Sequence, residues 1–136
     1  MFLLDTNVIS ELRRAHKKDP RVHSCLSSIE PSQLFLSVIT VLEIEASALR
    51  LERRDRHQSA ILRTWIDNYI LPQFRGRILP VDIAVARCCA RLHVPNPRAE
   101  RDALIAATAL VHGLTVVTRN EVDFEPMGVL ILNPWS

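Results

Sequence analysis

The sequence predicts an α/β domain built around a central, mostly parallel sheet. Short apolar runs alternate with amphipathic helical stretches along the whole chain, which is the pattern of such a domain. The 136 residues are 48% hydrophobic and 24% charged, which is ordinary for one globular domain and leaves no room for a second of usual size. No tandem repeat or low-complexity tract interrupts the pattern. We therefore expect residues 1–136 to form a single domain.

Apolar runs predict the strands, and capping residues predict the helix starts, in the first half of the chain. Thr6 or Asn7 is expected to cap the first helix, because short polar side chains accept hydrogen bonds from the free amides there. Pro20 suits the first turn of the second helix. Thr40 is expected to cap a longer helix with an apolar stripe at helical spacing. The expected elements are a strand at 2–4, helices at 6–13 and from 19, a strand at 34–38, and helices from 40 and at 56–71.

The second half continues the alternation. Asp82 is expected to cap a helix that runs to His93, after which Pro95 and Pro97 break the chain. The next helix is expected to end at Gly113, because glycine readily adopts the left-handed conformation found there. The expected elements are a loop at 72–76, a strand at 77–79, helices at 82–93 and 99–112, and strands at 114–117 and 129–132.

Charge, cysteine content and hydropathy exclude several classes of protein. Lys and Arg number 17 and Asp and Glu 15, and this net charge of +2 argues against a polybasic nucleic-acid binder without excluding nucleic acid. Three cysteines, two of them adjacent, do not resemble an extracellular disulfide framework. The N-terminus does not resemble a signal peptide, and no apolar run approaches the roughly 20 residues that span a bilayer. We expect a cytoplasmic protein with no membrane association.

Four acidic residues share one structural context although they are far apart in the sequence. Asp5 follows the first strand, and Glu43 lies near the start of the helix after the second. Asp102 opens a later helix, and Asp123 follows the strand at 114–117. In an open parallel sheet these positions all fall at the edge where the strands end, so the four side chains are able to converge. Glu43 and Asp102 also have an ordinary explanation, because the first turn of any helix favours acids.

Carboxylates gathered at that edge predict a divalent cation. Carboxylates beside buried strands repel one another and raise one another's pKa values, and a cation removes that cost. Oxygen ligands suit Mg²⁺, with Mn²⁺ as the other candidate, and such an ion keeps positions open for substrate phosphates. It also lowers the pKa of a bound water and stabilises displacement at phosphorus. The chemistry indicated is phosphodiester hydrolysis.

Four ordered motifs surround these acids and span nearly the whole chain. They are LLDTNVISEL from Leu3, SVITVLE from Ser37, DALIAATA from Asp102, and TRNEVDF from Thr118 followed by VLILNPW. With these motifs the sequence resembles a PIN-domain ribonuclease of the VapC type, the toxin of bacterial toxin–antitoxin pairs. The resemblance implies a PIN-like α/β/α sandwich and a magnesium-dependent endoribonuclease inhibited by a small cognate antitoxin of the VapB type. It also implies a homodimer, with a larger toxin–antitoxin assembly on operator DNA as a further form.

The resemblance also assigns roles to the acids. Asp5, Glu43 and Asp102 match the metal-binding acids of the family. Asp5 and Asp102 are expected to hold the ion. Glu43 and Asp123 are expected to shape its outer shell and to help activate the attacking water, which completes the catalytic set.

Three polar residues are expected to support this set. Asn7 is expected to hydrogen bond to Asp5, and Thr6 to lie beside the metal. Asn120 stands where many relatives have an aspartate, so Asp123 is expected to act in place of that missing carboxylate.

Arg98, Arg101 and Arg119 are the candidates for RNA contact. Arg98 and Arg101 flank Asp102, and arginine binds phosphate without reading sequence. A solvated surface is the ordinary explanation for any single arginine and for a basic cluster after the first helix. That cluster consists of Arg13, Arg14, Lys17 and Lys18.

Two helical patterns leave their alternatives open. Cys89 and His93 lie four residues apart, so a zinc pair is geometrically possible, but a core cysteine and a histidine that complements the helix dipole are the favoured explanation. An apolar face belongs either to the core or to a surface for a second subunit or an antitoxin. Its residues are Leu62, Trp65, Ile66 and Tyr69.

Two other functions compete with the nuclease. A non-catalytic module of the same fold, used for RNA docking or assembly, is the main alternative because Asn120 leaves the acidic set incomplete. A phosphoaspartyl phosphatase or receiver domain also places an aspartate after an early strand. The absence of any lysine beyond residue 18 argues against a receiver domain.

Overall fold

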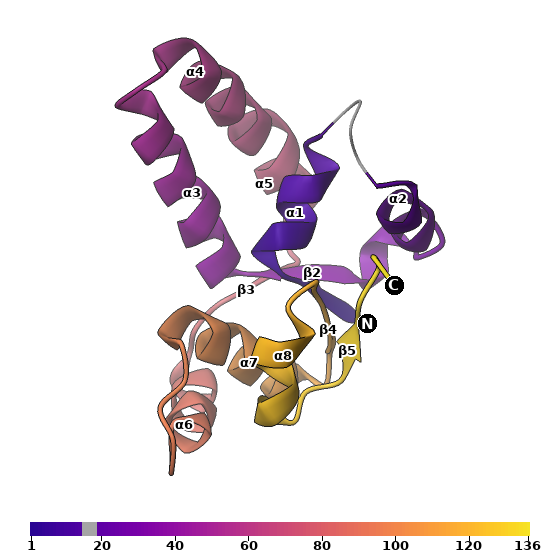
Figure 1. Cartoon of the computed structure of the whole chain (residues 1–136), viewed down its shortest axis with the longest axis vertical. Coiled ribbons are helices and arrows are strands. Elements are labelled where there is room, and N and C mark those ends of the chain that lie inside the picture. Colours follow the sequence, from indigo (N-terminus) through magenta and orange to yellow (C-terminus); the bar gives the residue numbers. More distant parts are fainter. Residues whose placement is uncertain (15–18) are drawn as a thin grey trace.

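Five strands form one sheet in which every neighbouring pair is parallel. A computed structural model describes residues 1–14 and 19–136, so Lys17 and Lys18 of the basic cluster lie outside the described residues. The strands are β1 (Phe2–Leu4), β2 (Leu34–Ser37), β3 (Ile78–Leu79), β4 (Thr115–Val117) and β5 (Ile131–Leu132). Their order is β3-β2-β1-β4-β5, with β1 at the centre (Figure 1). The predicted parallel sheet is confirmed.

Helices cover both faces of this sheet. They are α1 (Thr6–Leu12), α2 (Pro20–Ser27), α3 (Val38–Glu52), α4 (Arg56–Trp65), α5 (Leu71–Gln73), α6 (Ile83–Leu92), α7 (Glu100–His112) and α8 (Glu121–Phe124). Figure 1 shows α6, α7 and α8 on one side of the sheet and α1 to α4 on the other. The predicted α/β/α sandwich is confirmed. Among the described helices, none is long and apolar enough to cross a membrane.

The two layers of core meet at the central strand. Successive side chains of a strand point to opposite faces, so Leu3 packs with Ala106 and Phe124 while Leu4 packs with Val8 and Ile44. Both leucines are fully buried. The strand is therefore held from both sides, and the residue that follows it has a fixed position.

Two predicted helix caps are wrong, and each lies close to the true one. Asp5, not Thr6 or Asn7, caps α1 and accepts a hydrogen bond from the amide of Thr6 at 2.8 Å. Ser37, not Thr40, caps α3 and accepts from the amide of Ile39 at 3.0 Å. In both cases the strand passes into the helix with no intervening loop, so the first polar residue after the apolar run is the cap.

The helix predicted at 56–71 extends further and changes its hydrogen-bond pattern. After α4, residues Ile66–Ile70 form a π-helical turn, and α5 then carries the helical path through Pro72 to Gln73. Proline has no amide to donate, and a change of register beside it lets a helix pass such a residue. The expected loop at 72–76 is therefore helical in its first half.

Candidate active site

Four acids from four helical segments come together where the parallel strands end. Asp5 follows β1, Glu43 lies in α3, Asp102 in α7 and Asp123 in α8. Their charges act on one another, because Glu43 and Asp123 both raise the pKa of Asp5. Burial is the first cause of the raised pKa of Asp102, and the charges of the other three acids add to it. We call these four residues the acidic centre.

Asp5 is the buried member of the acidic centre, with 4% of its surface exposed. Burial raises its pKa, and hydrogen bonds from Thr118 and Thr6 oppose that rise. Its Oδ2 accepts from the hydroxyl of Thr118 at 2.9 Å and from Nδ2 of Asn7 at 3.3 Å. Its Oδ1 accepts a hydrogen bond from the amide of Thr6, so the protein orients both carboxylate oxygens. This arrangement fixes the carboxylate before any ligand binds.

Thr118 is a site residue that the sequence reasoning did not single out. It lies just after β4, is fully buried, and links three parts of the site. Its hydroxyl donates to Asp5 and accepts from Nδ2 of Asn7 at 3.3 Å and from the amide of Asn120 at 3.0 Å. The signal was a threonine at the end of an apolar strand, where it resembles an ordinary strand residue.

Glu43 is oriented by a second hydroxyl. The side chain of Thr6 donates to its Oε1 at 2.6 Å, and Nη1 of Arg101 lies 3.9 Å from its Oε2. Thr6 therefore contacts two acids at once, Asp5 through its amide and Glu43 through its hydroxyl. Arg101 brings a positive charge from α7 to the edge of the acidic centre.

Asp102 and Asp123 form the more open side of the acidic centre. Burial and the three neighbouring acids raise the pKa of Asp102 to about 6. Asp123 is exposed in the short helix α8, which the sequence analysis did not predict. Asn120 precedes this helix, and among the described residues it contributes its backbone amide, not its side chain, to the site's hydrogen bonds.

The donors of the acidic centre fit a hydrated divalent cation. All are carboxylate oxygens, which Mg²⁺ and Mn²⁺ prefer, and burial together with the neighbouring acids raises the pKa values of Asp5 and Asp102. Within the described ranges, no three of these acids bring ligand atoms within 4.8 Å of one another. Mg²⁺ does not require three such oxygens in direct contact, because it keeps several waters and takes one or two protein carboxylates.

Cys89, His93 and Glu100 do bring their ligand atoms within 4.8 Å of one another, but their hydrogen bonds argue against a zinc site. Nε2 of His93 lies 3.6 Å from Sγ of Cys89 and 3.4 Å from a carboxylate oxygen of Glu100. Nδ1 of His93, however, accepts from the amide of Arg98 at 3.1 Å. The ring proton of the neutral imidazole must then sit on Nε2, where it blocks metal ligation. The trio instead joins α6 to the start of α7 and fixes the backbone at Arg98.

The three candidate arginines lie in different surroundings. Arg98 lines a cavity with Asp102 and Asp123, and Arg101 lies beside Glu43. Arg119 instead places its guanidinium over the ring of Trp135, 5.3 Å from the ring centre. Only Arg98 and Arg101 of these three are thus found against members of the acidic centre.

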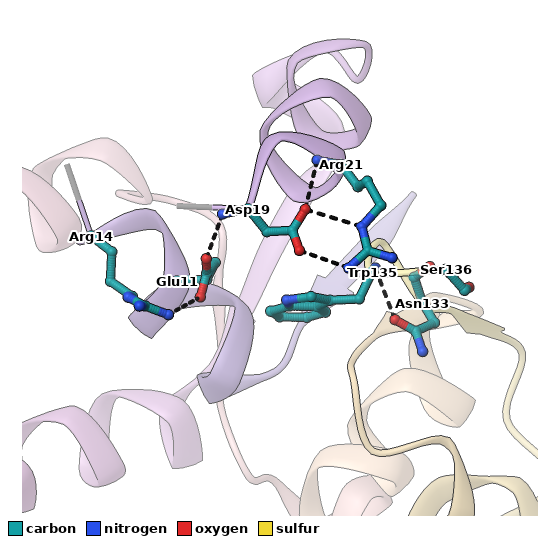
Figure 2. Close-up of polar contacts among 7 residues, drawn as sticks. All are labelled: Glu11, Arg14, Asp19, Arg21, Asn133, Trp135 and Ser136. Atoms are coloured by element: carbon teal, nitrogen blue, oxygen red, sulfur yellow. Dashed lines mark hydrogen bonds and ion pairs between the residues drawn. The ribbon is translucent and has the colours of Figure 1, made fainter. Parts of the chain in front are cut away.

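Trp135 belongs to a separate polar cluster beside α2. Figure 2 shows its ring near the ion pair of Asp19 and Arg21, in which two guanidinium nitrogens donate to the two carboxylate oxygens. These hydrogen bonds, with a smaller effect of the Arg119 charge, lower the pKa of Asp19 to about 2. The buried carboxylate of Glu11 accepts from the amide of Asp19 at 2.7 Å and so ties α1 to the start of α2.

Comparisons by family model, by sequence and by structure all find proteins similar to this chain. The family model described as PIN domain matches residues 2–128. Toxin FitB of Neisseria gonorrhoeae is 41% identical over 142 residues, which cover 99% of each chain. VapC ribonuclease Y4jK of Sinorhizobium fredii is 36% identical over 141 residues, covering 100% of this chain and 99% of that one. The crystal structure of FitAcB from Neisseria gonorrhoeae superposes with a TM-score of 0.91 at 38% identity, covering 99% of both chains.

Proposed function

This chain belongs to the PIN domain family, and we propose that it is a toxic, magnesium-dependent endoribonuclease held inactive by a cognate antitoxin protein. The acidic centre carries this proposal, because four mutually repelling carboxylates at one sheet edge are suited to bind a divalent cation. Relatives that match essentially the whole chain are named a ribonuclease and a toxin. The family resemblance read from the four motifs is confirmed by the matching family model.

Each residue of the centre has a role in this proposal. Asp5 and Asp102 would hold the cation, which supplies positive charge for the phosphate oxygens and lowers the pKa of a bound water. Thr118 keeps both carboxylate oxygens of Asp5 in place together with the Thr6 amide. Glu43 and Asp123 accept hydrogen bonds and protons around the attacking water, and no residue forms a covalent intermediate. Arg101 positions the phosphate backbone by charge.

The partner proteins are proposed on chemical and structural grounds. A ribonuclease that attacks the RNA of its own cell requires an inhibitor, and the name of the FitB relative includes the word toxin. We propose a VapB-type antitoxin, a homodimer and an assembly with operator DNA, as the family resemblance implies. The paired helices α3 and α4 project from the sheet and expose Leu49 and Ile61, which suits a protein partner (Figure 1).

The apolar face predicted from Leu62 to Tyr69, on α4 and the π-helical turn after it, divides between core and surface. Leu62 and Ile66 are buried in the core. Tyr69 is 53% exposed and stacks on Trp65 with ring centres 6.3 Å apart. Core is therefore the explanation for Leu62 and Ile66, and we propose that the exposed Tyr69 belongs to a surface for a second subunit or an antitoxin.

The proposed activity is tested by metal dependence. Purified protein is expected to cut single-stranded RNA in Mg²⁺, to lose that activity in excess EDTA, and to regain it when Mg²⁺ is restored, as followed by gel electrophoresis of an end-labelled RNA. Because Mn²⁺ takes the same oxygen ligands, it is expected to substitute. Binding of RNA with no cleavage in either metal would support the docking module instead. Undiminished cleavage in EDTA would show that the acidic centre does not act through a cation.

Thr118→Val is expected to lower the cleavage rate about 10- to 100-fold, the usual cost of losing a group that orients a metal ligand. The change removes a hydrogen bond that lowers the pKa of Asp5, so the acid limb of the pH–rate profile is expected to move to higher pH. Thr108→Val is the matched control, because Thr108 is equally buried and its hydroxyl donates only to the carbonyl of Leu104 within α7. Equal rates and pH profiles for the two variants would contradict the role of Thr118.

A further inference from the structure

A cavity of about 240 Å³ opens beside the acidic centre, between the start of α7 and the segment that follows β4. Asp102 and Asp123 line the side that it shares with the centre. Pro97, Val122 and Met127 supply apolar surface on the remaining walls. Drug-sized ligands occupy sites of roughly 300–1,000 Å³, so this smaller volume suits a single ring system.

Arg98 is the cationic group of this cavity. His93 fixes its backbone through the 3.1 Å hydrogen bond to the amide. Its side-chain Nε is buried and has no hydrogen-bond acceptor among the described residues. Because Nε is enclosed, the terminal Nη groups are the donors that Arg98 has for a ligand in the cavity. The arginine therefore supplies the positive charge of a cavity whose polar walls also include Asp102 and Asp123.

The chemistry of the walls selects among the bases of RNA. Arginine donates two hydrogen bonds most favourably to O6 and N7 of guanine, whereas adenine presents an amino donor in place of O6. Guanine also carries donors on N1 and N2, and one carboxylate oxygen of Asp123 is able to accept a hydrogen bond from them while the other faces the attacking water. Apolar side chains on the other walls cover the faces of a planar ring. Guanine is thus the base whose two edges match an arginine and a carboxylate together.

We propose that this cavity binds a guanine base of the RNA next to the phosphodiester bond that is cut, with Arg98 as the residue that selects it. This inference rests on the proposed ribonuclease function, because it places the base beside the acids of that reaction. The recognition is of an unpaired base, since a base stacked within a duplex does not present its edges to a side-chain-lined cavity. Sequence preference in the RNA then follows from one pocket and one side chain.

Nucleotide binding tests the pocket independently of catalysis. The chain has two methionines, Met127 in the cavity wall and Met1 at the exposed N-terminus, so methyl-labelled methionine gives one reporter and one internal reference. Without metal, 5′-GMP is expected to shift the Met127 signal and leave Met1 unchanged. 5′-AMP is expected to bind roughly 5- to 150-fold more weakly, the range for a good bidentate contact. Arg98→Met is expected to remove the difference, while Arg53→Met, at the exposed end of α3, retains it.

Different results would contradict the proposed guanine pocket and the proposed ribonuclease function. Equal shifts with 5′-GMP, 5′-AMP and inorganic phosphate would show an anion site and reject base selection. No shift of Met127 at millimolar 5′-GMP would reject the pocket whether or not the protein cuts RNA. A selective shift in a protein without metal-dependent cleavage would leave the pocket standing and reject the proposed function.

Cleavage of modified RNA tests the hydrogen bond itself. A random RNA pool is expected to be cut with guanine fixed at one position beside the cleaved bond. Replacing that guanine by 7-deazaguanine removes the N7 acceptor and is expected to slow wild-type cleavage at least about fivefold. The same replacement is expected to have no effect on Arg98→Met, because the donor is already absent. Identical slowing in both proteins, or cleavage of the pool without base preference, would contradict the proposal.

Discussion

Asp102→Asn is expected to reduce RNA cleavage at least about 100-fold and, in the same molecule, to stabilise the metal-free protein at pH 7.5. The loss of activity follows because the variant removes a proposed metal ligand, and loss of groups that merely orient such ligands costs about 10- to 100-fold. The gain in stability follows because the centre holds a carboxylate whose ionisation its burial and its three acidic neighbours oppose. Removing the charge removes that repulsion.

The sign of the stability effect depends on pH. The pKa of Asp102 is about 6 in the folded protein and 3.8 as its ordinary value, so between these pH values the folded state binds more protons than the unfolded state. Stability therefore falls as the pH rises through this interval, and the cost persists above pH 6. Because Asp102 is only partly buried, solvent screening limits this cost to about 1 kcal/mol.

Chemical denaturation in EDTA at two pH values measures this effect. Asp102→Asn is expected to exceed the wild-type free energy of unfolding at pH 7.5 and to match it near pH 4, where the carboxyl group is protonated. Asp82→Asn is the matched control, because Asp82 caps α6 outside the acidic centre and asparagine is as good a cap. A stability gain that is the same at both pH values, or cleavage at the wild-type rate, would contradict the assignment.

Phe124→Ala is expected to lower the free energy of unfolding by about 3–5 kcal/mol, the usual cost of deleting a buried aromatic side chain. Phe124 is fully buried at the end of α8 and packs in the core layer that contains Leu3 and Val116. Urea denaturation at equilibrium measures the loss. Val122→Ala in the same short helix is the control, because Val122 is 82% exposed and its change is expected to stay within about 0.5 kcal/mol. Similar losses for both variants would show that α8 is not anchored by Phe124.

The acidic centre was predictable from the sequence because its position depends only on topology. Once the strands are parallel, the residues after each strand must meet at one edge, whatever the details of the loops. Asp5 and Asp102 could be placed in this way without knowing which residue caps which helix. The caps themselves were missed by one to three positions, because more than one polar residue lies near the end of β1 and of β2 and only the backbone path selects among them.

The contributions of Thr118 and α8 could not be predicted from the sequence, and the reason differs from that for the caps. Thr118 acts through Asp5, 113 residues earlier, and this contact exists only once β4 has paired with β1. Four residues of α8 are too few to show a helical period. Glu100 likewise joins Cys89 and His93 only after α6 and α7 have packed. Local patterns do not carry such long-range contacts.

The order of strands determines when the acidic centre is able to form during synthesis. β1 leaves the ribosome first, but the amide of Asp5 donates to the carbonyl of Val117, and its side chain requires Thr118. A nascent chain that ends before β4 therefore contains three of the four acids and the β2 partner of β1, but lacks the strand whose Val117 and Thr118 hold Asp5. Because these contacts are so distant in sequence, they form slowly and late. Between the synthesis of β1 and the completion of the acidic centre, the chain therefore lacks the arrangement of carboxylates on which the proposed RNA cleavage depends.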